Sequence, residues 1–257
     1  MLPDPNQIVY ESADVVRDYR HHQQLTKGER VLFTEHSDDF REKKVLDLGV
    51  GAGRTTPALA GMAAEYWGID YSLAMVQACK DRFAGVGNAR FLQDDARSLS
   101  HCPDLYFDAA VFSFNGIDVV DIEGRKAVLE AVHRVLKPGG VFVFSFHNAG
   151  YLETLYRYHW QKNPLRWWAN YQRQQKIKSI NGPKEQYADK PHFSLKDGGE
   201  DFRLDICYMK PSYQQQMLAE AGYQLEQCVE SLSGKALAPE DINASKACWL
   251  YYRCSRK

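Results

Sequence analysis

Short apolar runs alternate with amphipathic stretches over the first 146 residues of the chain. Five of the runs have the length and the β-branched or aromatic content of buried strands: residues 45–48, 66–70, 88–92, 107–112 and 141–146. Between them, apolar side chains recur at helical spacing in residues 57–64, 73–83 and 123–136. Such alternation predicts an α/β fold with a doubly wound, mostly parallel sheet, whose ligand site lies at the carboxyl ends of the strands.

The two ends of the chain extend this pattern. Residues 10–33 carry apolar and aromatic side chains at roughly helical spacing, which predicts one or two helices against the edge of the core. Residues 211–221 predict a helix that ends at Gly222. Residues 223–229 and 248–254 predict a sixth and a seventh strand, with a polar loop at 235–245 between them.

Composition excludes few classes of protein. A chain of 257 residues with 44% hydrophobic and 25% charged residues is ordinary for a globular protein, and its net charge of −1 gives no overall attraction to nucleic acid or membrane. No apolar run approaches the roughly 20 residues that span a bilayer. The start, MLPDPNQ, lacks the features of a signal peptide, and the six cysteines form no Cys-x-x-Cys pair. We therefore expect a cytoplasmic protein without a metal site.

The most informative stretch is residues 44–56, KVLDLGVGAGRTT. Asp47 stands just before Gly49, Gly51 and Gly53, and a helix follows the turn. Glycine lets the backbone approach a ligand closely, and the free N–H groups of a helix start favour a polar or anionic group. Dinucleotide-binding enzymes use a similar turn, but their spacing is Gly-x-Gly-x-x-Gly rather than Gly-x-Gly-x-Gly.

Three motifs together resemble the class I S-adenosylmethionine-dependent methyltransferases. They are the glycine turn with its leading acid, the pattern Asp70-x-Ser72-x-x-Met75, and the run RVLKPGG at 134–140 before an apolar strand. The resemblance implies a seven-stranded Rossmann-like sheet whose last strand is antiparallel in a terminal hairpin. It also implies S-adenosyl-L-methionine as cofactor and S-adenosyl-L-homocysteine as product.

The resemblance also implies a cofactor site. Asp70 ends the second strand, where a carboxylate accepts hydrogen bonds from both ribose hydroxyls. Asp95 would accept from the adenine amino group, with Asp94 standing where the family has glycine. Tyr19 would touch the methionine end, or simply sit at a helix–core boundary. The full expected set is Tyr19, Asp47, Gly49, Val50, Gly51, Arg54, Asp70, Tyr71, Met75, Asp94, Asp95, Ala96 and Phe112.

An insertion separates the fifth strand from the helix at 211–221. Residues 151–171 hold seven Tyr and Trp side chains, and residues 150–196 hold nine Lys or Arg against three Asp or Glu. Residues 201–209 alternate like a strand. Three interpretations of the insertion are open: a lid with Trp167 and Trp168 over the substrate, a basic aromatic surface for RNA, and a helical excursion or dimer contact. We expect the lid.

These boundaries divide the chain into four parts. Residues 1–43 form a helical segment over the cofactor site, 44–148 the cofactor-binding core, 149–210 the lid, and 211–257 the helix and hairpin that complete the core.

The candidate catalytic residues follow the fourth and fifth strands. His147 titrates near neutral pH and suits a general base or a substrate hydrogen bond, although capping the strand end explains it equally well. Asn115 is a second catalytic candidate, and Asn115, Asp118, His147 and Asn148 are candidates for substrate binding.

The expected function is methyl transfer to a nitrogen or oxygen nucleophile of a small molecule, by in-line displacement in a covered pocket. The alternatives are a transfer RNA methyltransferase that uses the insertion, and a non-catalytic cofactor-binding protein. We expect a monomer or homodimer, with a small-molecule substrate and neither nucleic acid nor membrane as partner.

Overall fold

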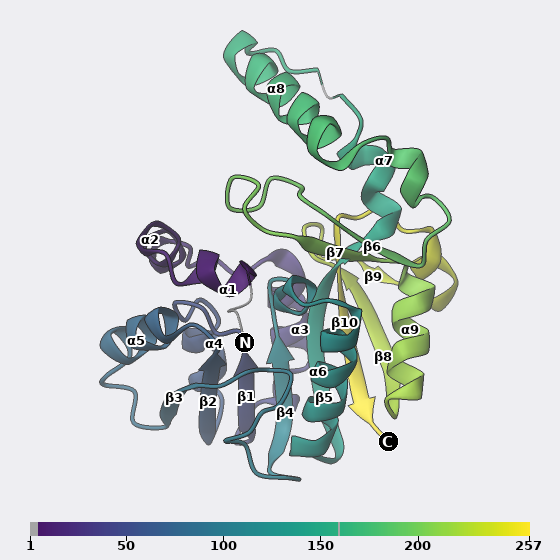
Figure 1. Ribbon diagram of the computed structural model, residues 1–257. Coiled ribbons are helices and arrows are strands. Elements are labelled where there is room, and N and C mark those ends of the chain that lie inside the picture. The colour runs from purple at the N-terminus through teal and green to yellow at the C-terminus, as the bar shows by residue number, and fades with distance from the viewer. Residues whose placement is uncertain (1–4, 159) are drawn as a thin grey trace.

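The computed structural model describes residues 5–158 and 160–257, and a single mixed sheet forms their centre (Figure 1). The strand order is β3-β2-β1-β4-β5-β10-β8-β9, and β6 and β7 extend the sheet beside β5. The strands are β1 Lys44–Leu48, β2 Glu65–Asp70, β3 Ala89–Gln93, β4 Phe107–Phe112, β5 Leu136–Asn148, β6 His192–Leu195, β7 Ile206–Met209, β8 Tyr223–Glu230, β9 Ala236–Leu237 and β10 Trp249–Arg256.

Helices cover both faces of this sheet, as a doubly wound fold requires (Figure 1). Apolar residues of α6 and α9 pack against one face, and those of α3, α4 and α5 pack against the other. The helices are α1 Pro5–Tyr10, α2 Ala13–His21, α3 Lys27–Glu35, α4 Thr56–Ala60, α5 Leu73–Arg82, α6 Ile122–Val135, α7 Leu152–Leu155, α8 Pro164–Asn181 and α9 Pro211–Glu220.

The predicted pairing of the core is confirmed. β1 pairs in parallel with β2 and β4, and β3 and β5 continue the parallel sheet outward. β10 lies antiparallel between β5 and β8, which is the expected terminal hairpin. All seven strands of the expected core sheet are present. Because β1 to β5 are parallel, their carboxyl ends meet at one edge of the sheet.

The sheet is larger than the seven-stranded sheet that the resemblance implies, and it includes the strand predicted within residues 201–209. β9 lies within the predicted polar loop, and β6 and β7 come from the insertion. β5 extends to Asn148, beyond the predicted end at residue 146, so its outer end has an edge that β7 occupies through the pair His147–Tyr208. β7 begins only at Ile206, because Glu200, Asp201 and Phe202 have φ angles of 44°, 54° and 66° and form a turn.

The N-terminal segment contains three helices, where one or two were predicted. Ser12 and Thr26, at the N-cap positions of α2 and α3, interrupt the apolar spacing. Thr26 and Glu29 form a capping box, in which the backbone N–H of Thr26 donates to the Glu29 carboxylate at 2.6 Å.

The insertion forms α7, α8, β6 and β7, and α8 projects away from the sheet (Figure 1). Only Gln174 and Ile177 of α8 are buried. Among the described residues, no helix has the length and apolar character needed to cross a membrane.

Candidate active site

Two adjoining cavities lie at the carboxyl edge of the sheet. The inner cavity has a volume of about 90 Å³ and the outer one about 310 Å³, and both are lined by Tyr19, Gly49, Gly51, Ser113 and Phe114. The structure brings all the expected cofactor residues to these two cavities. The inner one is lined by Tyr19, Gly49, Gly51, Asp70, Tyr71, Met75, Asp94, Asp95, Ala96 and Phe112, and the outer one adds Asp47, Val50 and Arg54.

Asp70 connects the glycine turn to the start of α5. The backbone N–H of Gly51 donates to its Oδ2 at 2.9 Å, and that of Ser72 donates to its Oδ1 at 2.9 Å. Burial raises the pKa of Asp70 to about 6. Each carboxylate oxygen accepts more than one hydrogen bond, so Asp70 keeps acceptor capacity for ligand hydroxyls at the cavity wall.

Asp47 is held inside the turn. Its Oδ2 accepts hydrogen bonds from Thr55 Oγ1 at 2.5 Å and from the Tyr66 hydroxyl at 2.6 Å. Burial raises the pKa of Asp47 to about 6. Since both bonds join the end of β1 to the start of α4 and to β2, Asp47 fixes the shape of the glycine turn.

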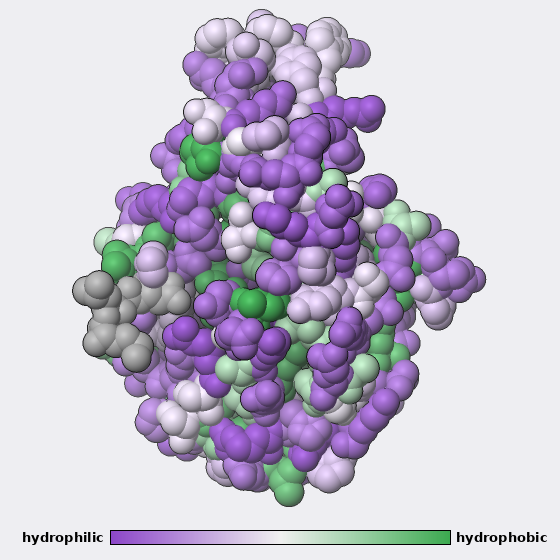
Figure 2. All heavy atoms as spheres, turned by 45° about the vertical axis from the view of Figure 1, so that its right-hand side comes forward, coloured by the Kyte–Doolittle hydropathy of each residue, from purple (hydrophilic) through white to green (hydrophobic). Residues whose placement is uncertain are grey.

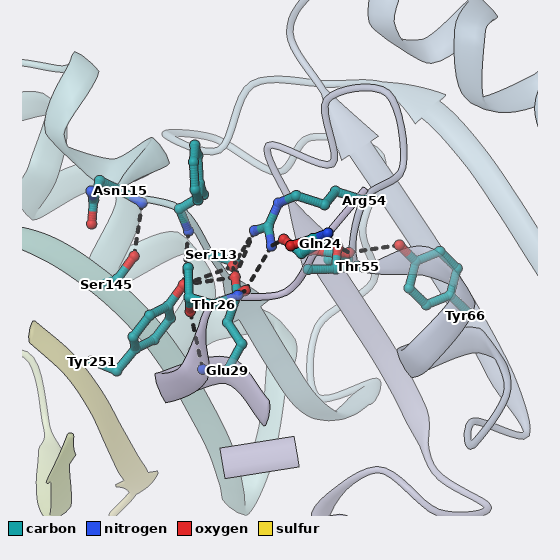
Figure 3. A network of polar contacts seen from close by, with 12 residues as sticks. Gln24, Thr26, Glu29, Arg54, Thr55, Tyr66, Ser113, Asn115, Ser145 and Tyr251 are labelled. Carbon is teal, nitrogen blue, oxygen red and sulfur yellow. Dashed lines mark hydrogen bonds and ion pairs between the residues drawn. The ribbon is translucent and has the colours of Figure 1, made fainter. Parts of the chain in front are cut away.

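Arg54 forms a buried ion pair with Glu29 of α3 (Figure 3). Two guanidinium nitrogens donate to the two Glu29 oxygens at 2.6 Å each. Ser113 and Tyr251 also donate to this carboxylate. Burial alone would raise the pKa of Glu29, but the hydrogen bonds and charge of Arg54 outweigh it and lower the pKa. Arg54 therefore ties the glycine turn to α3 and to the loop after β4, a partnership that the sequence did not reveal.

Asp94 and Asp95 have different surroundings. The Asp94 carboxylate accepts from the backbone N–H groups of Asp95, Ser100 and His101 at 2.8, 3.2 and 2.9 Å, so it holds the loop after β3. Asp95 pairs with Arg97 at 2.6 Å, and Arg97 lowers the pKa of Asp95 although burial opposes this. Asp94 is therefore the loop-holding residue of the two.

Several cavity residues were missed. The Tyr10 ring lies 5.8 Å from that of Tyr19 and 6.0 Å from that of Tyr71, between centroids, and all three line the inner cavity. Tyr10 lay within the predicted N-terminal helical segment, but the break at Ser12 hid its position. Glu200, from the insertion, lines the outer cavity. The remaining missed residues of the inner cavity are Ile69, Arg97, Ser113, Phe114, Gly116, Val119, Val120 and Val128.

His147 faces a third cavity, of about 200 Å³, between β5, α7 and α8. Its Nδ1 lies 2.7 Å from Asp118 Oδ2, and its backbone N–H donates to the same oxygen at 2.6 Å. The other Asp118 oxygen accepts from the fully buried Arg125. The Nε2 atom of His147 lies 3.6 Å from Oδ2 of Asp197, so a carboxylate oxygen stands beside each ring nitrogen of His147.

A row of aromatic rings connects the third cavity with the other two. Phe114, which lines the inner and outer cavities, has its ring centroid 5.2 Å from that of Trp249. The Trp249 ring lies 5.5 Å from that of His147. The Phe114–Trp249 pair therefore stands between the glycine turn and the imidazole.

Two predicted substrate residues lie away from the cavities or are engaged in other contacts. The Asn148 amide donates to the carbonyls of Ser245 and Ala247 at 2.9 and 3.0 Å, and its Oδ1 accepts from the Gly150 N–H. The prediction that Asn148 binds substrate is not supported, because these bonds use its side chain to hold the chain around β10. Asn115 has a φ of 61°, and its buried Oδ1 accepts no hydrogen bond from the described residues. It is not among the residues that line the three cavities.

Trp167 and Trp168 lie on the projecting α8 and line none of these cavities. Their rings pack on each other, with centroids 6.3 Å apart. The expectation that they cover the substrate is not supported. The part of the insertion nearest the glycine turn is instead the segment with Glu200, whose neighbours Phe202 and Leu204 join an apolar cluster with Val15 of α2.

Comparison with known proteins gives the class. Residues 45–140 match the family model of the methyltransferase domain. A demethylmenaquinone methyltransferase of Clavibacter sepedonicus is 39% identical over 114 residues, which cover 44% of this chain and 45% of that protein. An uncharacterized methyltransferase of Bacillus subtilis, YcgJ, is 37% identical over 135 residues, 51% of each chain. The matched region thus spans about half the length of these curated relatives.

The fold agrees over nearly the whole chain. The crystal structure of an S-adenosylmethionine-dependent methyltransferase from Mesorhizobium loti superposes with a TM-score of 0.62 at 19% identity, covering 88% of this chain and 98% of that one. Residues 45–140 therefore match a methyltransferase domain, and the likeness of nearly the whole chain to the solved structure is one of fold. The described residues contain no group of His, Cys, Asp and Glu side chains that could hold a metal ion.

Proposed function

We propose that this chain transfers the methyl group of S-adenosyl-L-methionine to a small molecule that carries an ionisable hydroxyl. One observation carries the proposal: the buried Asp70 carboxylate, the Gly49–Gly51 turn and the Tyr10–Tyr19–Tyr71 rings surround one cavity at the carboxyl edge of the sheet. When bound, the cofactor supplies an electrophilic methyl group on a sulfonium.

The residues around the cavity would each hold one part of the cofactor. Asp70 would accept from the ribose hydroxyls, Tyr71 and Met75 would flank the adenine, and Asp95 would accept from its amino group. The helices α1 and α2 would close over the ligand through Tyr10 and Tyr19, and thereby exclude water from the reacting groups.

The acceptor atom is the finer part of the proposal. The motifs suggested a nitrogen or oxygen nucleophile, whereas the relative named as a demethylmenaquinone methyltransferase points to a quinone-derived ring. A phenolic or quinol hydroxyl serves both reactions, because its anion is nucleophilic at oxygen and at the adjacent ring carbons. Removal of the hydroxyl proton is therefore the step that the protein must assist.

His147 is our candidate for the general base. Asp118 lies at Nδ1 and Asp197 at Nε2, so two carboxylates would stabilise a proton taken up by the imidazole, and Arg125 holds Asp118 from its other side. The proposed acceptor site lies at the Phe114–Trp249 pair, between the glycine turn and His147. Aromatic walls there suit a planar ring.

Binding and transfer are tested in sequence. Isothermal calorimetry with S-adenosyl-L-methionine comes first, followed by release of S-adenosyl-L-homocysteine in the presence of a quinol, an amine or transfer RNA. Release with the quinol alone supports the proposal. Release with transfer RNA alone supports the RNA alternative, and binding without release on any of the three supports a non-catalytic protein.

Replacing Asp70 by alanine should weaken cofactor binding at least tenfold. The variant removes the acceptor of two hydroxyl groups, and hydrogen bonds to a charged group contribute about 1.5–3 kcal/mol. The exposed Asp241 supplies the control, because Asp241→Ala changes net charge equally without touching the cavities. Equal affinities for Asp70→Ala and the wild type in calorimetry would show that Asp70 does not bind the cofactor.

Cofactor affinity should fall as the pH drops through about 6. The pKa of Asp70 is about 6 in the free protein, and ribose hydroxyls donate to its ionised form, so binding lowers this pKa. Below that pH the ligand must displace a proton, which costs up to tenfold in affinity for each pH unit. The Asp70→Asn variant should lose this dependence, and calorimetry over the range from about pH 5 to about pH 8 measures it. An unchanged slope in Asp70→Asn would assign the effect to another group, such as Asp47.

A further inference from the structure

The first half of α8 and the residues just before it form an exposed projection, which we call the α8 tip (residues 160–171). Its large apolar side chains lie largely in solvent: Leu165 is 80% exposed, Trp160 70% and Trp168 51%. Folded proteins seldom leave such side chains together without a partner. In Figure 2 the projection at the top of the molecule carries pale side chains beside strongly hydrophilic ones.

The charge of the tip and of the helix behind it has one sign. The tip contains Lys162 and Arg166, and residues 160–178 as a whole contain five Lys or Arg residues and no Asp or Glu, in a chain whose net charge is −1. Lys162 and Arg166 of the tip are exposed, and neither forms an ion pair with a carboxylate of the described chain. The remaining basic residues lie farther along α8, where Lys176 pairs with Asp201.

The aromatic rings of the tip stabilise one another. The Trp167 and Tyr171 rings are nearly parallel, at 7° with centroids 5.9 Å apart, and Trp168 stacks on Tyr171 at 5.7 Å. This packing holds the rings on the helix rather than on the core. Within the part of the chain that the structure describes, Trp160 and Leu165 pack on no other ring and join no apolar core cluster, and they extend the apolar surface toward the outer end of the helix.

We propose that the α8 tip docks on the surface of a bilayer that contains anionic lipids. Tryptophan and tyrosine favour the membrane–water interface, where an apolar ring meets hydrated headgroups. Trp160, Leu165 and Trp168 insert among the headgroups, and Lys162 and Arg166 contact the anionic lipids. Basic residues near such a surface and buried apolar side chains together give reversible binding. The sequence prediction of no membrane partner rested on the net charge and on the absence of a spanning segment, and this proposal departs from it.

Charge decides against a second copy of the chain as the occupant. Symmetric docking of two tips would bring two uniformly basic surfaces together, which repel each other. RNA is also disfavoured. The Trp167, Trp168 and Tyr171 rings already stack on one another, which covers faces that bases would need, and the most exposed apolar residue is the aliphatic Leu165.

The projection lies on the side of the molecule where the carboxyl ends of the parallel strands β1 to β5 lie (Figure 1). Docking therefore turns the edge of the sheet that holds the cavities toward the lipid. The inference goes beyond the proposed reaction and does not depend on the acceptor, since it concerns binding alone.

The test is co-sedimentation of the full chain with vesicles. One set is phosphatidylcholine, and the other contains about 30% phosphatidylglycerol. We expect the wild type to bind the acidic vesicles at least about tenfold more tightly than the neutral ones. The variant Trp160→Ala, Leu165→Ala, Trp168→Ala should bind the acidic vesicles at least about tenfold more weakly than the wild type. The variant Lys162→Glu, Arg166→Glu should lose binding to a similar degree, and added salt should weaken wild-type binding.

Two control variants make comparable changes at exposed positions outside the tip. Leu232→Ala removes another exposed leucine, and Lys80→Glu with Lys235→Glu makes the same change in net charge; both should bind like the wild type. Because the altered side chains are exposed, all variants should keep the thermal midpoint and the affinity for S-adenosyl-L-methionine. Absence of wild-type binding to acidic vesicles overturns the inference, as does equal loss in tip and control variants. Loss of transfer RNA binding or of dimerisation in the tip variant, without vesicle binding by the wild type, assigns the surface to RNA or to a second copy instead.

Discussion

Gly51→Val should abolish binding of S-adenosyl-L-methionine in a chain that still folds. Gly51 has a φ of 54°, lines both adjoining cavities, and donates its N–H to Asp70. A Cβ there would lie 3.0 Å from Cδ1 of Tyr19, and the two methyl groups of valine would enter the space of the ligand. The backbone strain of about 1–3 kcal/mol lies below the total stability of a typical domain.

A second glycine distinguishes the effect of backbone strain from the effect of filling the cavity. Gly139 has a φ of 73°, and an added Cβ there would meet nothing within 4 Å. Gly139→Val therefore imposes similar strain without filling the cavity, and it should keep wild-type affinity in calorimetry. Gly51→Ala, with less added volume, should fall between wild type and Gly51→Val. A folded Gly51→Val protein with wild-type affinity would falsify the placement of the cofactor at the turn.

His147→Gln should reduce methyl transfer by about 10²–10⁴ while cofactor affinity stays unchanged. Glutamine keeps a polar group of similar reach, but it cannot take a proton from a hydroxyl. The imidazole does not line the two cavities assigned to the cofactor, so binding of S-adenosyl-L-methionine is independent of it. The measurement is single-turnover release of S-adenosyl-L-homocysteine on the acceptor found above, with calorimetry on the same protein.

The pH profile distinguishes a base from a structural histidine. The wild type should lose activity as the pH falls, because a base must be unprotonated to accept a proton, and raising the pH should not restore His147→Gln. His192→Gln is the control, because His192 packs on Tyr213 at the far side of β7 and lines none of the three cavities. Full turnover by His147→Gln would leave His147 with the structural role of holding Asp118. Asp118→Asn is unsuitable as a probe, since it would leave Arg125 buried without its anionic partner.

The core was predictable because its signals are local. Strands buried on both faces require continuous apolar runs, and the helices between them need one apolar stripe, so the order of elements could be read from periodicity. The glycine turn and Asp70 were predictable for the same reason. Each follows a recognisable strand, and parallel strands bring their carboxyl ends to one edge.

The roles of single polar residues were less predictable. Asn148 and Asp118 both lie near the end of β5, but one holds the loop around β10 and the other holds His147. Similarly, Arg54 pairs with Glu29, which lies 25 residues earlier in the chain. Partners so distant in sequence are set by tertiary packing, and no periodicity records them.

The sequence by itself determined the fold class, the terminal hairpin and the edge of the sheet at which the cofactor residues meet, because hydrophobic spacing and turn chemistry act over a few neighbouring residues. Only the tertiary structure decided where each part of the insertion packs. Its aromatic content suggested a lid, yet burial depends on what an element packs against. β7 pairs with the outer end of β5, and Glu200 lines the outer cavity. In α8 only Gln174 and Ile177 are buried, so most of this helix is exposed to solvent.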